Sequence, residues 1–325
     1  MKYIALPPQV RTAERRLSFY LAMEEYVARS IDETDCFFMW QVEPSIILGR
    51  NQLIENEVNV DFCRRRGIQM YRRKSGGGCV YADKSNVMLS YVTKDDSVSL
   101  TFHRYINMVI LVLRQLGVEA TSSGRNDVLI DGRKVSGNAF YHLPGRSIVH
   151  GTMLYDTCME NMLGAITPSS AKLTSKGVQS VRQHIALLKD YVSIGLDEFK
   201  AFVRQNLCVG EILLTEADVH AIELVEQDYL TDEFIYGRNP KYSLVKRARI
   251  EGVGELEARL ELKNGVIQGA NLMGDYFLLG ELDALLSRMR GVKLEPGALA
   301  QALPERLDDV VRNLTRDDFI HLLTS

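Results

Sequence analysis

The apolar residues in the first third of the chain change from helical spacing to strand-like runs. Residues 12–31 carry apolar side chains at intervals of three and four, which predicts an amphipathic helix. Two apolar runs follow at 36–42 and 45–50, and the Glu43-Pro44 pair between them predicts two strands joined by a tight turn. A short helix at 59–66 and strands at 68–73 and 87–92 complete this region.

The middle of the chain alternates in the same way. Residues 97–116 keep helical spacing and end at Gly117, which predicts a long packed helix. Asp131-Gly132 between two apolar runs predicts a two-residue hairpin turn. A strand at 147–155 and helices at 159–166, 196–207 and 216–229 follow.

The pattern changes beyond Asn239-Pro240. Alternating runs at 256–262 and 266–272, joined by a turn at 263–265, predict a hairpin. Short helical patterns follow at 280–290, 296–302, 304–313 and 317–323. The chain is therefore predicted to be α+β, with a large mixed-sheet domain at residues 1–237 and a small α+β accessory domain at 238–325.

Composition limits the classes of function. The 325 residues have a formal net charge of −3, with 25% charged residues, so neither nucleic acid nor a membrane is an expected partner. No apolar stretch approaches the length of a membrane span, and the first residues lack a secretory signal pattern. Five widely spaced cysteines show no metal-binding spacing. We expect a cytoplasmic protein with reduced thiols.

The stretch RRKSGGGCVYAD at 72–83 is the first candidate site. Glycine is unfavourable in both helices and strands, so three in succession between two predicted strands need a reason. One reason is a bulged turn with a solvated basic flank. The other is close approach of the backbone to a ligand, and cationic groups beside free N–H donors favour an anionic one.

The stretch GRNDVLIDGRKVSGNAF at 124–140 is the second candidate. Strict alternation would place Lys134, Ser136 and Asn138 on one side of a strand, and Asn126 and Asp127 would enter the same hairpin from the opposite strand. This pattern predicts a polar stripe that faces a pocket, although a lysine in a strand can also belong to a solvated face.

Two further segments carry polar groups. The strand SIVHGTMLY at 147–155 contains His150, which can be a hydrogen-bonded core residue or a site residue. The segment that follows the next helix, TPSSAKLTSKGVQSVRQHI, is long and polar, which is uncommon inside a compact domain unless the loop is functional. A flap over an anionic ligand is one such function, and the side chains suited to it are Lys172, Lys176, Ser180 and Arg182.

In this order and spacing, the motifs resemble those of lipoate–protein ligases, within the biotin/lipoyl protein ligase fold group. The resemblance covers most of residues 30–190, and the tail is similar in size and position to the family's accessory domain. It implies ATP-dependent activation of lipoate to lipoyl-AMP, with Mg²⁺, followed by transfer to a lysine of a lipoyl-domain acceptor. Acceptors of this kind are the E2 subunits of 2-oxoacid dehydrogenases and the glycine cleavage H protein.

The resemblance also implies roles for individual residues. Lys134 is expected to contact both the lipoate carboxyl group and the α-phosphate. The other residues implied to bind lipoate or ATP are Arg73, Ser75, Gly76, Gly77, Gly78, Cys79, Val80, Tyr81, Asn126, Asp127, Ser136, Gly137, His150, Gly151, Thr152, Lys176 and Arg182. Asp127 is the expected Mg²⁺ ligand. Apolar tunnel candidates are Trp40, Leu48, Val80 and Val135. One departure is Ala82, where the family often has histidine.

Two other functions fit the same motifs. A cysteine-dependent octanoyl or lipoyl acyltransferase would need an activated thiolate, for which Cys79 and Cys158 are the candidates, with packed thiols as the alternative. A non-catalytic lipoate-binding protein would not need Lys134 and the complete glycine stretch. A biotin ligase is disfavoured because no GRGRxxR-like run is present.

Overall fold

A computed structural model describes residues 1–11, 14–52, 54–94, 97–124, 126–166, 184–236, 244–263 and 265–325. Contacts divide the chain into two compact units. The first contains Met1–Leu48, Ile54–Arg73 and Val80–Ile235, and the second contains Gly49–Leu53, Lys74–Cys79 and Tyr236–Ser325. The three glycines, with Lys74, Ser75 and Cys79, therefore belong to the second unit, whereas the two ends of the stretch at 72–83 belong to the first. None of the described helices is long and apolar enough to cross a bilayer.

The first unit is built on a mixed eight-stranded sheet with the order β11-β1-β2-β6-β10-β9-β8-β7. Its strands are β1 (Lys2–Ala5), β2 (Asp35–Trp40), β6 (Val87–Thr93), β7 (Ala120–Ser122), β8 (Asp127–Ile130), β9 (Arg133–Leu143), β10 (Arg146–Met153) and β11 (Gly210–Leu213). A separate sheet has the order β4-β3-β5, formed by β3 (Ser45–Leu48), β4 (Gln69–Arg72) and β5 (Val80–Ala82).

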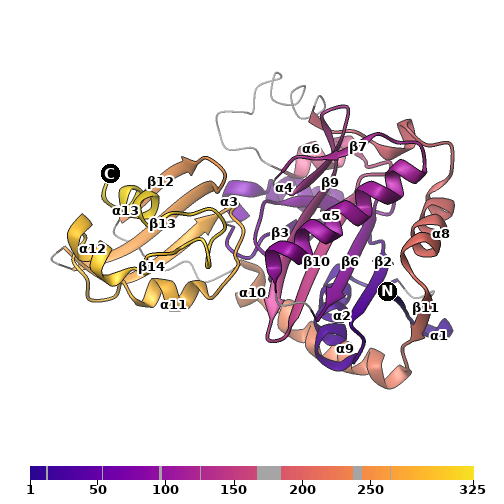
Figure 1. Cartoon of the computed structure of the whole chain (residues 1–325), viewed down its shortest axis with the longest axis horizontal. Coiled ribbons are helices and arrows are strands. Elements are labelled where there is room, and N and C mark those ends of the chain that lie inside the picture. Colours follow the sequence, from indigo (N-terminus) through magenta and orange to yellow (C-terminus); the bar gives the residue numbers. More distant parts are fainter. Residues whose placement is uncertain are drawn as a thin grey trace. The chain divides into compact units, whose positions relative to one another are not determined.

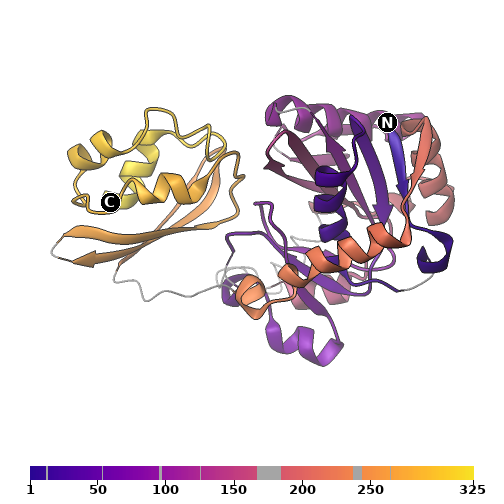
Figure 2. The ribbon, with the colours of Figure 1, turned by 90° about the horizontal axis from the view of Figure 1, so that it is seen from below.

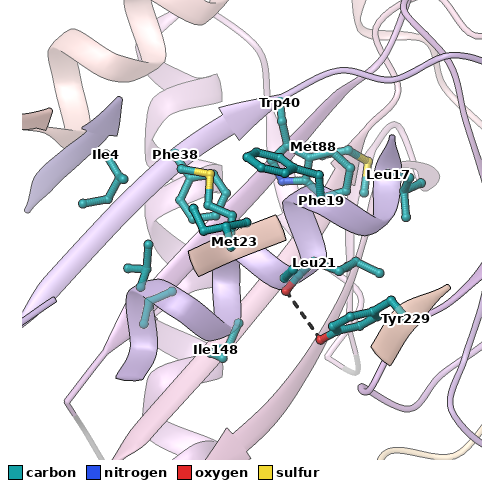
Figure 3. Close-up of a cluster of buried hydrophobic side chains, with 14 of the residues drawn as sticks. Ile4, Leu17, Phe19, Leu21, Met23, Phe38, Trp40, Met88, Ile148 and Tyr229 are labelled. Carbon is teal, nitrogen blue, oxygen red and sulfur yellow. Dashed lines mark hydrogen bonds between the residues drawn. The ribbon is translucent and has the colours of Figure 1, made fainter. Parts of the chain in front are cut away.

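Helices cover both faces of the large sheet (Figure 1). On one face, α2 (Leu17–Ser30) and α9 (Glu216–Tyr229) pack on an apolar cluster that includes Phe38, Val92 and Ile148. Figure 3 shows this cluster and the hydrogen bond from the Tyr229 hydroxyl to the Leu21 carbonyl, at 3.5 Å. We call this the α2 face.

The long helix α5 (Val98–Gln115) covers the opposite face, called the α5 face below. Its Phe102 and Tyr105 pack on Phe140 and Tyr91, with ring centroids 5.1 and 6.2 Å apart. These two strand residues alternate with residues of the α2 face, as the two-residue period of a strand requires. The large sheet is thus the middle of three layers.

Local capping explains where several helices begin and end. The Asn59 side chain accepts from the Phe62 N–H at 3.0 Å to start α4, which ends at Gly67 with φ of 66°. Thr215 and Asp218 form a reciprocal capping box at the start of α9. The remaining helices of the first unit are α1 (Pro8–Arg11), α3 (Ile54–Glu57), α4 (Val60–Arg66), α6 (Met159–Ala165), a 3₁₀ turn (Leu188–Asp190), α8 (Leu196–Leu207) and α10 (Asp232–Tyr236).

The rest of the second unit is a three-stranded antiparallel sheet with helices on one face (Figure 2). Its elements are β12 (Leu244–Ile250), β13 (Gly254–Lys263), β14 (Val266–Gly274), α11 (Leu282–Ser287), α12 (Pro296–Ala302) and α13 (Arg316–Thr324). A core with Leu260, Leu272 and Phe319 at its centre lies between sheet and helices.

The long elements and the Asp131-Gly132 hairpin are confirmed, with φ of 51° and 72° at the two turn residues. The α+β class is confirmed as well. The helix predicted at 304–313 is wrong, because these residues form turns and bends around the buried Leu307 and Val311. Glu43-Pro44 does not close a hairpin, since β2 and β3 belong to different sheets. The pattern also missed the short strands β1, β7 and β11 and the longer β12.

Candidate active site

Directly paired residues form a row across the α2 face of the large sheet. From β2 to β8, each residue pairs with the next in the series Trp40, Met88, Thr152, Gly137 and Asp127. With strands about 4.8 Å apart, the four steps of this cross-strand row span about 19 Å. The row is apolar at its Trp40 end and charged at its Asp127 end.

A β-bulge brings Lys134 to the charged end of the row. Val128 pairs with Ser136 and Leu129 with Lys134, so Val135 is one extra residue on β9. The bulge breaks the alternation, and Lys134 lies over Gly137 on the α2 face. A Cβ at Gly137 would be only 2.7 Å from the Lys134 Cε and Nζ atoms.

The predicted polar stripe is therefore wrong. Asn138 is only 4% exposed and lies on the α5 face, because its side chain fills the space beside Gly151 and the Tyr105 hydroxyl. Ser136 is fully buried on the same face and donates to the Asn138 Oδ1 at 3.2 Å. Of the three residues, Lys134 alone lies with Asp127.

Lys134 and Asp127 form an ion pair that solvent can reach. Their Nζ and Oδ1 atoms are 2.8 Å apart, and the side chains are 40% and 25% exposed. A pair this exposed contributes at most about 1 kcal/mol to stability, so an incoming phosphate can replace the carboxylate. The Ser123 hydroxyl accepts from the Asp127 N–H at 3.1 Å, and the Ser123 N–H donates to the Asp127 carbonyl at 3.0 Å. The sequence reasoning missed Ser123.

A buried polar network lies beside the apolar end of the row. Trp40 Nε1 donates to the Ser90 Oγ at 2.8 Å, and Ser90 donates to Glu24 Oε1 at 2.5 Å. The second oxygen of Glu24 lies 2.8 Å from His150 Nδ1. Glu24 and Ser90 have no exposed surface, and His150 is 5% exposed. Glu24 was missed as a site residue, although a carboxylate on the apolar stripe of the first helix was a detectable signal.

The three glycines of the triplet have different surroundings within the second unit. Gly77 has φ of 85° and donates its N–H to the Tyr276 carbonyl at 2.9 Å. A Cβ at Gly76 would lie 2.5 Å from the same carbonyl oxygen, and a Cβ at Gly49 would lie 2.0 Å from the Gly77 oxygen. Gly78 has no described atom within 4 Å of its Cβ position. Close packing within the chain thus explains Gly76, positive φ explains Gly77, and the Cβ position of Gly78 borders open space.

Buried residues lie near the triplet on both sides, whereas Lys74, Cys79 and Val80 are half-buried. The Arg73 guanidinium donates to the Ile47 carbonyl at 3.0 Å and is 4% exposed, and Ser75 is 1% exposed. Burial raises the pKa of the Tyr81 hydroxyl well above its usual value. Ala82 lies in the apolar core with no exposed surface, so this departure from the family pattern is a packing position in this chain.

Asp83 connects the end of this stretch to the segment after β10. Its two carboxylate oxygens accept from the backbone N–H groups of Ser85 at 2.9 Å and Cys158 at 3.0 Å. Asn86 makes a parallel connection by donating to the Thr157 hydroxyl at 2.9 Å. These bonds fix the position of Cys158, the residue before α6.

The thiols differ in exposure and acidity. Burial raises the pKa of Cys36 to about 12 and that of Cys208 to about 11, and it also raises the pKa of Cys63. These three are therefore protonated and unreactive near neutral pH. Cys158 is exposed and Cys79 is half-buried.

The remaining predictions concern the polar segment and metal binding. Lys172, Lys176, Ser180 and Arg182 lie outside the described residues. Among the side chains that the structure does describe, no three His, Cys, Asp or Glu residues form a group suited to a metal ion. A metal held by one carboxylate together with phosphate oxygens would not require such a group.

The chain matches two family models. Residues 17–208 match the lipoyl protein ligase A/B catalytic domain, and residues 239–323 match the bacterial lipoate protein ligase C-terminus. The lipoate-protein ligase LplJ of Bacillus subtilis is 34% identical over 93% of this chain and 95% of its own length. These matches define a ligase catalytic domain followed by a ligase C-terminal domain.

Two solved structures share the fold. P. falciparum LipL1 in complex with lipoate superposes with a TM-score of 0.78 at 18% identity, covering 99% of this chain and 98% of its own. A bipartite lipoate protein ligase from Thermoplasma acidophilum, described with its E2 lipoyl domain, gives a TM-score of 0.64 at 25% identity over 75% of this chain and 98% of its own. The chain belongs to the lipoate–protein ligase family, and its activity is ligation of lipoate to protein.

Proposed function

We propose that the charged end of the cross-strand row is the adenylation centre and that Lys134 is its catalytic residue. The observation that carries this proposal is the bulge at Val135, which turns Lys134 onto the same face as Asp127 and the apolar Trp40. Lipoate has a carboxylate at one end and an apolar chain at the other. A row with one charged and one apolar end suits such an acid.

Formation of the adenylate brings two anions together. A lipoate carboxylate oxygen attacks the α-phosphorus of ATP, a phosphorus–oxygen bond forms, the bond to the bridging oxygen breaks, and pyrophosphate leaves. The Lys134 ammonium reduces the repulsion between carboxylate and α-phosphate and holds both oxygens in position. A compact point charge with three donors suits such bridging.

Transfer to the acceptor uses the same charge. The lysine amine of the acceptor attacks the carbonyl carbon of lipoyl-AMP, a carbon–nitrogen bond forms, the bond to the AMP oxygen breaks, and the nitrogen loses a proton. Lys134 stabilises the oxyanion that develops on the carbonyl oxygen. The proposed acceptors are lipoyl domains of E2 subunits and the glycine cleavage H protein, in keeping with the E2 lipoyl domain described with the Thermoplasma relative.

Asp127 is the residue that would hold Mg²⁺. The fit rests on its single, partly exposed carboxylate, since Mg²⁺ usually takes one or two protein carboxylates and completes its shell with water and phosphate oxygens. A bound Mg²⁺ would neutralise phosphate charge. An Asp127 carboxylate that held Mg²⁺ would leave the Lys134 ammonium to the substrates.

Three of the other predicted residues lie in this row or beside it. Thr152 and Gly137 form the floor of the row, and His150 lies in the network beside its apolar end. Gly78 belongs to the second unit and stays a predicted binding residue, since its Cβ position borders open space. We assign both half-reactions to residues 1–237 and an accessory role to residues 238–325, in keeping with the two matched models.

The test is Lys134→Ala, compared with Lys189→Ala as a matched control. Lys189 is 41% exposed and pairs with Asp156, so it resembles Lys134 in exposure and partner. Pyrophosphate release should fall about 100- to 1,000-fold in Lys134→Ala, the usual effect of removing one such donor, with no change in melting temperature. The control should keep wild-type rates. Near-normal lipoyl-AMP formation by Lys134→Ala, detected by mass spectrometry, would refute the assignment.

A further inference from the structure

Asn138 joins the start of β8 to β9 by three hydrogen bonds. Its backbone N–H and its side-chain Nδ2 both donate to the Asn126 carbonyl, at 3.1 and 2.9 Å. In return, the Asn126 side-chain amide donates to the Asn138 carbonyl at 3.2 Å. Asn138 is only 4% exposed and Asn126 is half-buried, so these bonds are partly shielded from water.

Gly151 makes room for the Asn138 amide. The two residues pair directly across β9 and β10. A Cβ at Gly151 would lie 1.8 Å from the Asn138 Oδ1 and 2.9 Å from the Tyr105 hydroxyl. No Cβ can occupy that space while the amide is there. The Asn138 Oδ1 is also held by the Ser136 hydroxyl at 3.2 Å, so the amide has a fixed orientation.

The hydrogen bonds between Asn138 and Asn126, together with the packing of the Asn138 amide against Gly151, are called the interlock below. The interlock lies at the end of β8 that carries Asp127. Asn126 directly precedes Asp127, which pairs with Gly137 beneath Lys134. The backbone of Asp127 is held by Ser123 on the β7 side, and the Asn126 carbonyl is held by Asn138 on the β9 side. Without the Asn138 side chain, the Asn126 carbonyl would accept one hydrogen bond from β9, from the Asn138 backbone N–H, in place of two.

We propose that Asn138 is a positioning residue for the adenylation centre, and that Gly151 is required because the Asn138 amide occupies the space of its side chain. Asn138 fixes the Asn126 peptide, and the fixed peptide sets where the Asp127 carboxylate meets Lys134. Asn138 itself lies on the α5 face and does not touch the substrates. The catalytic part of this proposal rests on the roles proposed for Lys134 and Asp127.

The first test compares Asn138→Ala with Ser18→Ala. Ser18 is fully buried, donates to Glu226 at 2.5 Å, and lies outside β8 and β9, so its variant also loses a buried side-chain hydrogen bond. In Asn138→Ala we expect the kcat for pyrophosphate release to fall about 10- to 100-fold, with the KM for lipoate within about threefold of wild type. Ser18→Ala should lose stability and keep its kcat. A kcat within twofold of wild type in a destabilised Asn138→Ala would show a purely structural role.

The second test is a double-mutant cycle between positions 138 and 151. Gly151→Ala should lower melting temperature and kcat strongly in the wild-type background. The losses should be much smaller when Asn138 is already alanine, because the closest contact of the new Cβ, 1.8 Å to the Asn138 Oδ1, is then gone and only the Tyr105 hydroxyl at 2.9 Å remains close. Equal losses in both backgrounds would refute the interlock. The melting-temperature cycle tests the interlock even if the roles of Lys134 and Asp127 are wrong, whereas the kcat cycle tests its link to catalysis.

Asn138→Asp is a third variant that keeps the side-chain volume if Asn138→Ala does not fold. An ionised aspartate has no donor for the Asn126 carbonyl, whereas a protonated one has. Burial favours the protonated form by raising the carboxyl pKa. The ratio of variant to wild-type kcat should therefore rise as the pH falls from about 8 to about 6. A ratio that stays constant over this range would contradict the need for a donor at this atom.

Discussion

Gly137→Ala tests the geometry of the adenylation centre with a single methyl group. The new Cβ would lie 2.7 Å from the Lys134 Cε and Nζ atoms and 3.7 Å from Asp127 Oδ1. The second distance is an ordinary contact, whereas the first is too short. The substitution therefore acts on the lysine and leaves the carboxylate in place.

The magnitude follows from these distances. Carbon atoms in contact are about 3.7 Å apart, so the end of the Lys134 side chain must move by about 1 Å. A displacement of that size can lower a rate about 100-fold. The cost in stability is small, because the far end of a flexible side chain moves, and Gly→Ala at an ordinary φ can itself stabilise by about 0.4–1 kcal/mol. We expect the free energy of unfolding to change by less than about 1 kcal/mol.

The assay is pyrophosphate release with saturating ATP and lipoate, together with urea denaturation. Gly297→Ala is the control, because Gly297 lies in α12 and no described atom is within 4 Å of its Cβ position. The control should keep its rate and should keep or slightly gain stability. An adenylation rate in Gly137→Ala within threefold of wild type would refute the placement of Lys134 over this glycine.

Three further predictions concern other parts of the molecule. Glu24→Ala removes a carboxylate that is fully buried and bonded at both oxygens, so the free energy of unfolding measured in urea should fall by about 3 kcal/mol. An unchanged urea midpoint would contradict the hydrogen-bond network of Glu24, Ser90 and His150. Cys158→Ser should ligate lipoate within about twofold of wild type, and a loss of activity would favour the thioester route instead. Gly76→Ala should lower the melting temperature by about 5 °C, because its Cβ would lie 2.5 Å from the Tyr276 carbonyl oxygen. Gly78→Ala should keep the melting temperature and only raise the KM for a substrate. Equal melting temperatures of the two variants would show that the contact with Tyr276 does not hold the loop.

The sequence predicted the elements whose signals are local. Helix α5 buries one side and leaves the other exposed, so the spacing of its apolar residues is visible without any partner. Helix α2 is buried on most of its surface, and its apolar residues still recur at helical spacing. The Asp131-Gly132 turn requires positive φ at two residues, which those residue types tolerate. Strands β1 and β11 gave no such signal, because they are short and pair with segments that are distant in the chain.

The candidate site was only partly predictable, since its geometry depends on pairing between strands. The stretch around Lys134 was found, but strict alternation put the lysine on the same side as Asn138. A bulge inserts one residue into the pairing and leaves no distinct mark in an apolar strand. Asn138 and Ser123 were missed as positioning residues for the same reason. Their partners are set by the register of β7, β8 and β9.

Glycines that look like one kind of signal in the sequence have separate physical causes in the structure. Gly137 accommodates the Lys134 side chain, Gly151 accommodates the Asn138 amide, and Gly76 packs against a main-chain carbonyl. In each case a Cβ would meet another part of the same chain, and a bound ligand is not needed to explain the glycine. Gly78 is different, because its Cβ position borders open space. Within the triplet, a substitution that impairs substrate binding without affecting stability is therefore expected at Gly78 and not at Gly76.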